Sequence, residues 1–257
     1  MKHLTKLRGI KHFCHDFDGV FYSYSQIPDI QNEFAAAKAS VMCNLLNNAI
    51  TFKDAVAMSH EGIKKYNDPV KLQTEFASEL GYDPDSFKEQ LFKEYHKAIY
   101  RRFSTIAPHL FETDVNLRSA FAKCQDFLKH GVATHSCREG FCIPFLDAKG
   151  IRQFIEEHSI FGLKQSNFIP KSHTPLLVEL CFQSMGQIDD SERAFTEDST
   201  INLKIMKDSY PLVTTIYIHQ GQPLDKLPNY IDFQFQDLPE LLSARLEAER
   251  LTNPAYV

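Results

Sequence analysis

The segment GIKHFCHDFDGV, residues 9–20, contains the features from which the fold of this chain is predicted. Its apolar residues predict a short buried strand, and the acidic pair Asp16 and Asp18, followed by Gly19, predicts that this strand ends in a turn. Carboxylates two positions apart on an extended chain point the same way, so both can be directed at one cavity. One can act as a nucleophile and the other as a general acid and base. Asp16 and Asp18 are therefore the first candidate catalytic pair.

This acidic segment has two other interpretations. An EF-hand calcium loop that starts at Asp16 would need Gly at its sixth position and Glu at its twelfth. The chain has Phe21 and Ile27 there, so the EF-hand interpretation is excluded. A surface turn rich in Asp and Gly remains the alternative to a catalytic role.

Residues from about 28 to 103 have a helical pattern throughout and predict about four helices and no strand. Thr51 and Asp54 resemble a capping box at the start of one helix. The Asp-Pro pairs at 68–69 and 83–84 each place an N-cap residue before a proline at the first helical position.

From about residue 114 onward, strands and helices are predicted to alternate, which is typical of an α/β fold with a mostly parallel sheet. Strands are expected at 9–16, 132–136, 167–169, 194–196, 212–218 and 230–233, and helices at 117–128 (ending at Gly131), 151–158, 176–185 and 238–250. Ligands of such sheets collect at the carboxyl ends of the strands. Polar residues are expected at those ends: Asp16 and Asp18, Thr134 and Ser136, and Glu197 and Asp198.

The length of chain between the first two predicted strands indicates an insertion. A βαβ step takes roughly 30 residues, and far more sequence than that separates Asp16 from Thr134. The excess has about the size of the helical block, so that block is interpreted as a cap inserted into the core. The predicted division is 1–22 and 105–257 for the catalytic core and 23–104 for the cap.

Composition restricts the classes of partner. The net charge is −5 and the isoelectric point is about 6.1, so a basic footprint for DNA or RNA is absent and polymeric nucleic acid is not expected as a partner. No apolar run approaches the roughly 18 residues of a membrane span, and the charged N-terminus does not resemble a signal peptide. The six cysteines have no zinc-ligand spacing and are expected to be buried thiols in a cytoplasmic protein.

Four segments in order resemble the motifs of the haloacid dehalogenase (HAD) superfamily. They are DFDGV at 16–20, Thr134 at the end of a strand, Lys171 ahead of a helix, and EDSTIN at 197–202, which is similar to a Glu-Asp-Ser variant of the family's usual DDSxxN. The resemblance covers nearly the whole chain, although the helical insertion matches in size and helicity more than in sequence. It implies a HAD-like Rossmannoid parallel-sheet core with an inserted all-helical cap of the C1 type. The layout is most similar to the pyrimidine 5′-nucleotidase group.

The resemblance also implies roles for individual residues. Asp16 would attack phosphorus, and Asp18 would act first as general acid and then as general base. Thr134 and Lys171 would hold the phosphoryl oxygens. Mg²⁺ would be bound by Asp16, the carbonyl of Asp18, Asp198 and Glu197, the last either directly or through water. His135, next to Thr134, is a further candidate for binding substrate, with an ordinary hydrogen-bonded histidine as the alternative.

Some positions depart from the family pattern. Thr134 is followed by His135, where the family usually has Asn or Gly, and no proline follows Lys171. Lys164 is therefore a rival for the role of Lys171. The intact Asp18 favours hydrolysis of a phosphate ester over dehalogenation, because dehalogenases of this superfamily lack that second Asp.

The predicted function is that of a Mg²⁺-dependent phosphatase acting on a small phosphorylated metabolite. A nucleoside monophosphate is the first candidate substrate and a sugar phosphate the second. A sugar-phosphate mutase that shares the Glu-Asp-Ser variant, and a non-catalytic binding protein on the same fold, are the alternatives.

Overall fold

A computed structural model of the chain describes residues 2–66 and 71–251. The chain divides into two compact units. The first, here called the sheet unit, consists of Met1–Tyr24, Glu112–Arg138 and Leu146–Val257. The second, here called the helical unit, consists of Ser25–Phe111 and Glu139–Phe145.

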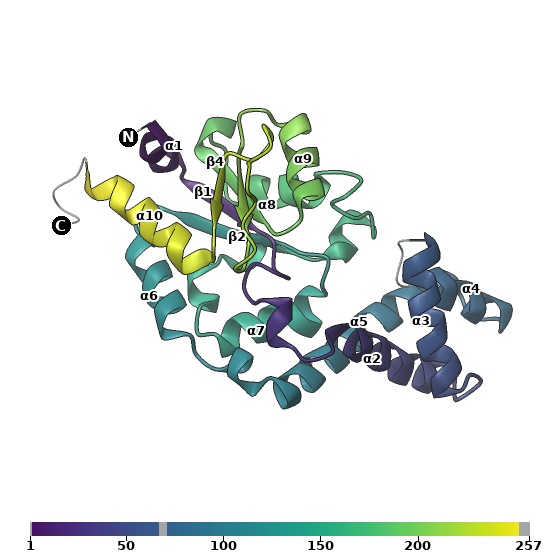
Figure 1. Cartoon of the computed structure of the whole chain (residues 1–257). Coiled ribbons are helices and arrows are strands. Elements are labelled where there is room, and N and C mark those ends of the chain that lie inside the picture. The colour runs from purple at the N-terminus through teal and green to yellow at the C-terminus, as the bar shows by residue number, and fades with distance from the viewer. Residues whose placement is uncertain (1, 67–70, 252–257) are drawn as a thin grey trace. The chain divides into compact units, whose positions relative to one another are not determined.

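The sheet unit is built on one sheet in which, among the described residues, all strand pairs are parallel. The strand order is β3-β2-β1-β4-β5-β6, with β1 and β4 at the centre (Figure 1). The strands are β1 (His12–His15), β2 (Lys129–Ala133), β3 (Ile160–Phe161), β4 (Arg193–Glu197), β5 (Thr214–Ile218) and β6 (Phe233–Phe235). All four residues of β1 are buried, as expected for a strand covered on both faces.

Helices cover the sheet. α8 packs on β1, β2 and β3, and α9 packs on β4 and β5, while α10 packs on both α1 and α6 (Figure 1). The helices of this unit are α1 (Lys2–Gly9), α6 (Val115–Cys124), α8 (Leu176–Ser184), α9 (Thr200–Ser209) and α10 (Leu238–Arg250), and α7 (Ile143–Ala148) lies where the two units meet in sequence. Gly131 allows the close approach of α8 to β2, because a Cβ atom there would lie 2.4 Å from Cys181 Sγ.

The described part of the helical unit contains α2 (Ile30–Leu45), α3 (Phe52–Tyr66), α4 (Lys71–Glu79) and α5 (Pro84–Ile106), and no strand. Thr51 Oγ1 accepts from the backbone N–H of Asp54, and Asp83 caps α5 by accepting from Ser86. The predicted cap at 68–69 lies outside the described residues. The unit extends beyond the predicted 23–104, to Phe111, and also takes in 139–145.

The strand predicted at 167–169 is wrong. The strand at this edge of the sheet is β3, and Asn167 and Phe168 instead have left-handed φ values of 53° and 62°. Asn167 closes the turn Leu163–Ser166 by donating its backbone N–H to Lys164. Asn favours this left-handed conformation, so the apolar residues that follow it do not continue a strand.

Two helix predictions are also wrong. Residues 151–158 form two short 3₁₀ turns, because Glu156 adopts an extended conformation with ψ of 133° between them. The helix expected to end at Gly131 is α6, which already ends at Cys124. Leu128 therefore lies just before β2, and Gly131 lies inside β2. β2 in turn ends at Ala133 rather than at 136, and β6 begins at 233 rather than at 230. The helices α1 and α7 were not predicted.

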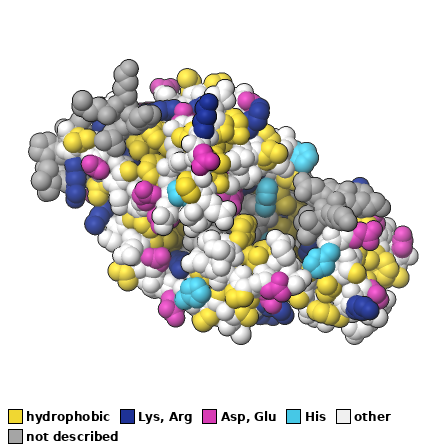
Figure 2. Space-filling model, viewed as in Figure 1, with side chains coloured by type: hydrophobic (Ala, Val, Ile, Leu, Met, Phe, Trp, Pro, Cys, Tyr) yellow, Lys and Arg dark blue, Asp and Glu magenta, His cyan; other side chains and the backbone are white. Residues whose placement is uncertain are grey.

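The surface and the cysteines show no unusual features. Basic and acidic side chains are interspersed over the face shown in Figure 2. Among the described helices, none combines the length and the apolar character that a bilayer crossing requires. All six cysteines are buried and none is part of a disulfide.

A chain of buried polar side chains crosses the centre of the sheet. His15 Nδ1 lies 2.8 Å from Thr196 Oγ1 on β4, and His15 Nε2 lies 3.0 Å from His130 Nδ1 on β2. The ring of Phe121 packs edge-on against His130 with ring centroids 4.6 Å apart. Nε2 of His130 has no hydrogen-bond partner among the described residues. These contacts join the three strands that carry the polar ends described below.

His130 is expected to make stability depend on pH. Burial lowers the pKa of His130 from 6.5 to about 3, so below 6.5 the unfolded chain binds a proton that the folded protein does not. The contribution of this ring is fully present above about pH 6.5 and is lost as the pH falls toward 3, by about 1.4 kcal/mol per pH unit.

His130→Asn tests this expectation, because Asn keeps a polar amide near the position of Nδ1, where it can donate or accept, and does not titrate. We expect the variant to lose about 1–3 kcal/mol near pH 7 through poorer packing. Between about pH 6 and pH 4 the free energy of unfolding of the variant should fall less steeply than that of the unmodified protein. The difference in slope should be about 1.4 kcal/mol per pH unit, which corresponds to one proton bound on unfolding. Urea unfolding across this range measures both effects, and equal slopes would contradict the prediction.

Candidate active site

The register of the sheet brings three strand ends together. His15 of β1 pairs with Val132 of β2 and with Thr196 of β4, so the residue after each of these positions lies at one edge of the sheet. The backbone N–H of Asp16 donates to Thr196 O over 2.8 Å, which continues the β1–β4 ladder to Asp16. Because the carboxyl ends of parallel strands share an edge, Asp16 and Glu197 become neighbours.

Three carboxylates cluster at this edge. Oxygen atoms of Asp16, Glu197 and Asp198 all lie within 4.8 Å of one another. Burial first, and then the charge of Glu197, raise the pKa of Asp16, whereas Lys171 opposes that rise. Burial and Glu197 also raise the pKa of Asp198, to about 8. The cluster thus holds more negative charge than its buried surroundings favour.

Lys171 is the buried cation of this cluster and is only 2% exposed. Its Nζ lies 2.5 Å from Asp16 Oδ1 and 2.9 Å from Glu197 Oε2, and it donates to Ala133 O over 3.1 Å. Burial alone would lower the pKa of Lys171, but the two carboxylates raise it above its usual range. Of the two candidate lysines, Lys171 contacts both carboxylates, whereas Lys164 lies in the turn Leu163–Ser166.

Glu197 is fully buried and uses both of its oxygens as acceptors. Oε1 accepts from the backbone N–H groups of Asp198 and Ser199, each over 3.1 Å. Oε2 accepts from Lys171 Nζ and, over 3.0 Å, from Asn202 Nδ2. Burial would raise the pKa of Glu197, but the charge of Lys171 and side-chain hydrogen bonds with Asp16, Asp198 and Lys171 lower it to about 2. Glu197 is therefore ionised and held by four donors.

Asp18 is held by three hydroxyl groups. Oδ1 accepts from Tyr22 over 2.6 Å, and Oδ2 accepts from Ser136 over 2.8 Å and from Thr134 over 3.2 Å. Burial raises the pKa of Asp18, and the hydrogen bonds from Tyr22 and Ser136 moderate that rise. The predicted residue Thr134 thus lies beside Asp18, and its Oγ1 also accepts from the backbone N–H of Ser136.

His135 contacts the lysine segment. Its Nε2 accepts from the backbone N–H of Lys171 over 2.8 Å. All seven residues predicted for the site therefore lie at or next to the strand ends of β1, β2 and β4.

The sequence did not identify Tyr22 as a partner of Asp18. It follows Asp18 by four residues, and no pattern in the sequence marks its hydroxyl as functional. Asn202 had a signal, since it ends the segment EDSTIN, but its contact with Glu197 was not predicted.

The residues at this edge fit a divalent cation. Carboxylate oxygens are the ligands that Mg²⁺ prefers. Glu197 accepts from four donors, whereas Asp16 accepts from two, Lys171 Nζ and the backbone N–H of Phe17, both at Oδ1. Asp16 and Asp198 are therefore the members of the cluster with capacity for an ion. Gly19 supports this fit: a Cβ atom there would lie 2.0 Å from Asp198 Oδ2, so only glycine leaves room for that carboxylate. Asp16, Asp198 and the backbone of Asp18 would hold the ion, with Glu197 behind them.

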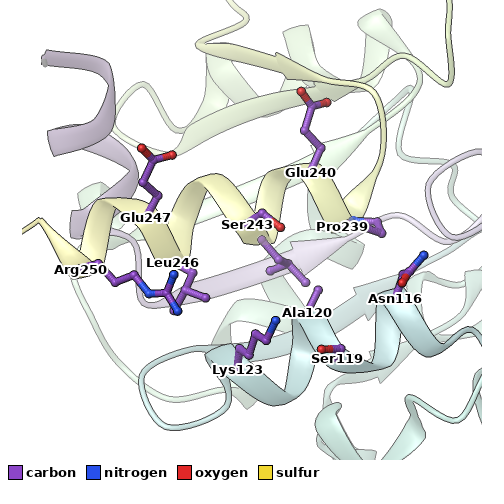
Figure 3. Close-up of a pocket in the computed structure, with 11 residues that line it drawn as sticks. Asn116, Ser119, Ala120, Lys123, Pro239, Glu240, Ser243, Leu246, Glu247 and Arg250 are labelled. Carbon is purple, nitrogen blue, oxygen red and sulfur yellow. The ribbon is translucent and has the colours of Figure 1, made fainter. Parts of the chain in front are cut away.

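A separate surface cavity of about 780 Å³ lies between α6 and α10 (Figure 3). It is lined by both basic and acidic side chains, including Lys123, Arg250, Glu240 and Glu247. None of the residues predicted for the site lines this cavity. Its mixed charge favours neither an anion nor a cation, so the strand ends remain the candidate site.

Comparison with known proteins identifies the fold. No family model matches the chain, and no curated protein matches it. Among solved structures, a protein of Burkholderia xenovorans described as haloacid dehalogenase-like has a TM-score of 0.53 at 13% identity, over 95% of this chain and 99% of that one. A 2-haloacid dehalogenase of Pseudomonas syringae pv. tomato has a TM-score of 0.52 at 10% identity, over 91% and 97%.

A third match is a protein of Bacillus subtilis, YfnB, described as a HAD-hydrolase and determined with magnesium bound. Its TM-score is 0.50 at 13% identity, over 91% of this chain and 97% of that one. The chain has the fold of the HAD-like hydrolases. The predicted fold class is thereby confirmed. At these identities the likeness concerns the HAD-like fold and not the reaction.

Gly19→Ala tests the fit of the carboxylate cluster to a cation. The new Cβ would displace Asp198, so we expect Mg²⁺ to raise the thermal unfolding midpoint of the unmodified protein but not that of the variant. Gly221→Ala is the matched control: Gly221 also has a positive φ, 90°, but a Cβ there meets nothing within 4 Å. Both variants should lose about 1–2 kcal/mol of stability from backbone strain. An equal response to Mg²⁺ in both variants would contradict the prediction.

Proposed function

We propose that this protein is a Mg²⁺-dependent phosphatase that hydrolyses a small phosphate monoester through an aspartyl phosphate on Asp16. The observation that carries the proposal is the pairing of a lysine-bound Asp16 with a second carboxyl group, Asp18, held beside it by three hydroxyls. An ester with a poor leaving group requires a proton donor as well as a nucleophile. The same pair provides both.

In the first proposed step, Asp16 attacks phosphorus and the bond to the leaving oxygen breaks. Asp18 delivers its proton to that oxygen, and the raised pKa of Asp18 favours the protonated form that this step needs. Lys171 offsets the charge of Asp16 beside the phosphoryl group, and Thr134 would turn its single hydroxyl proton from Asp18 to a phosphoryl oxygen when substrate binds. When bound, Mg²⁺ would supply further positive charge to offset repulsion between the phosphate and the carboxylates.

In the second step, Asp18 takes a proton from water, which attacks phosphorus. The bond between phosphorus and the Asp16 oxygen breaks, phosphate leaves, and Asp16 is restored. The bond from the Lys171 ammonium to Asp16 stabilises this leaving carboxylate. The cycle thus returns both aspartates to their starting states.

The substrate class is part of the proposal. A nucleoside monophosphate is the first candidate, from the likeness of the layout to the pyrimidine 5′-nucleotidases, and a sugar phosphate is the second. The helical unit, inserted between β1 and β2 in sequence, is proposed as the cap that selects the leaving group. Net charge and the interspersed surface charges support a small metabolite rather than a nucleic acid. The cytoplasm is the proposed location.

Asp18 also separates this proposal from its alternatives. The superfamily's dehalogenases lack the second Asp, so an ordered Asp18 favours phosphate esters even though one matched structure is a dehalogenase. A non-catalytic binding protein would have no use for an acid-base group. The pair Glu197 and Asp198 keeps a sugar-phosphate mutase as a second candidate, because the Glu-Asp-Ser variant occurs in such mutases.

Phosphate release from nucleoside monophosphates, sugar phosphates and p-nitrophenyl phosphate, with Mg²⁺ and with EDTA, tests the class of reaction. We expect turnover only with Mg²⁺. Asp16→Asn should abolish turnover, because the amide is not a nucleophile, and Asp18→Asn should lower kcat about 10²–10⁴-fold for poor leaving groups. Asp225→Asn, an exposed acid of the same unit, is the matched control and should retain full activity.

The outcome that contradicts the proposal is equally specific. Turnover that survives Asp16→Asn would exclude Asp16 as the nucleophile. Absence of release from every member of the panel by folded protein would favour the binding-protein alternative. Release accompanied by transfer of phosphate between positions of a sugar phosphate would favour the mutase.

A further inference from the structure

The segment that carries Lys171 lies outside any described helix or strand, and yet it places a buried ammonium between two carboxylates. Asn167 and Phe168, which precede Lys171 in the chain, have left-handed φ values. Pro170 has no backbone N–H to donate. No sheet ladder fixes the backbone of Lys171. A turn spans it, with the backbone N–H of His173 donating to Pro170 O over 2.9 Å. The backbone N–H of Lys171 itself donates to the side chain of His135, at Nε2, over 2.8 Å.

This contact determines the tautomer of His135. A backbone N–H can only donate, so Nε2 must carry a lone pair and the proton of the neutral ring must be on Nδ1. Burial first, and then the charge of Lys171, lower the pKa of His135 to about 3, so the ring is neutral at physiological pH. An imidazolium would present an N–H at Nε2 and break the contact.

The contact joins two parts of the site that are distant in sequence. His135 directly follows Thr134, whose hydroxyl reaches Asp18, while Lys171 reaches Asp16 and Glu197. The Nζ of Lys171 also bonds to Ala133 O, so both the backbone and the side chain of this lysine are anchored on the end of β2.

We propose that His135 is a positioning residue that acts through Nε2 on the Lys171 backbone, and so keeps Lys171 Nζ between Asp16 and Glu197. As far as catalysis is concerned, this rests on the proposed phosphatase function. It also gives a physical reason for a histidine at this position, where the family usually has Asn or Gly. A side chain as short as Asn does not reach as far as Nε2.

Two substitutions separate the two ring nitrogens. His135→Gln places an amide oxygen near the position of Nε2 and retains the acceptor for Lys171. His135→Asn places its amide near the position of Nδ1 and loses that acceptor. We expect His135→Asn to lower kcat about 10–10²-fold with a smaller change in KM, since a displacement of about 1 Å can cost that much. His135→Gln should recover most of the loss.

A measurement independent of activity accompanies the kinetics. Hydrogen exchange of the Lys171 amide should become about tenfold faster in His135→Asn than in the unmodified protein, and should remain close to unmodified in His135→Gln. Nitrogen NMR of the unmodified protein should show the proton of His135 on Nδ1. These readouts need no substrate, so they test the contact even if the phosphatase proposal fails.

Three results would overturn the inference. One is a proton on Nε2 of His135. The second is equal exchange of the Lys171 amide in both variants. The third is the reversed order of activity, with His135→Asn active and His135→Gln impaired, which would show that the ring acts on substrate through Nδ1 instead.

Discussion

The ion pairs of Lys171 are the interaction on which the site depends. Carboxylates at the ends of neighbouring parallel strands repel one another where little water reaches them. Lys171 Nζ lies between Asp16 and Glu197, at 2.5 and 2.9 Å, and removes part of that repulsion. Removing one partner of such a buried pair costs about 3–5 kcal/mol, because a charge is left without compensation. The lysine therefore allows Asp16, the carboxylate proposed as nucleophile, to remain in a buried position.

The lysine does not neutralise the site completely, and this explains its fit to a cation. Glu197 is satisfied by four donors, and Asp18 is satisfied by three hydroxyls, which leaves Asp16 and Asp198 with capacity for a ligand. The raised pKa of Asp198 reports the same excess of negative charge. Room for its carboxylate exists because residue 19 has no Cβ. The two roles proposed for the cluster, nucleophile and metal ligand, would thus both follow from one shortage of positive charge.

The sequence predicted which residues gather at this edge of the sheet, but it did not predict the course of the turns that carry some of them. Asp16, Thr134 and Glu197 were predictable because parallel strands end at one edge, whatever the path of the chain between them. The backbone path to Lys171 was not predictable, since it depends on left-handed conformations at Asn167 and Phe168 that a local apolar pattern conceals. For the same reason the third strand was misplaced. The contact of Tyr22 with Asp18 depends on a turn. Outside a helix or a strand, the spacing of two residues along the chain does not predict that their side chains meet.

The central claim is that Asp16 becomes phosphorylated, and chemical trapping of that intermediate tests it most directly. p-Nitrophenol leaves without needing a proton, so Asp18→Asn protein mixed with Mg²⁺ and p-nitrophenyl phosphate should accumulate the acyl phosphate. Borohydride reduces an acyl phosphate to an alcohol, which converts the modified aspartate to homoserine that peptide mass spectrometry can locate. The account predicts homoserine at position 16. Nitrophenol release without homoserine there, or homoserine at another aspartate, would contradict it.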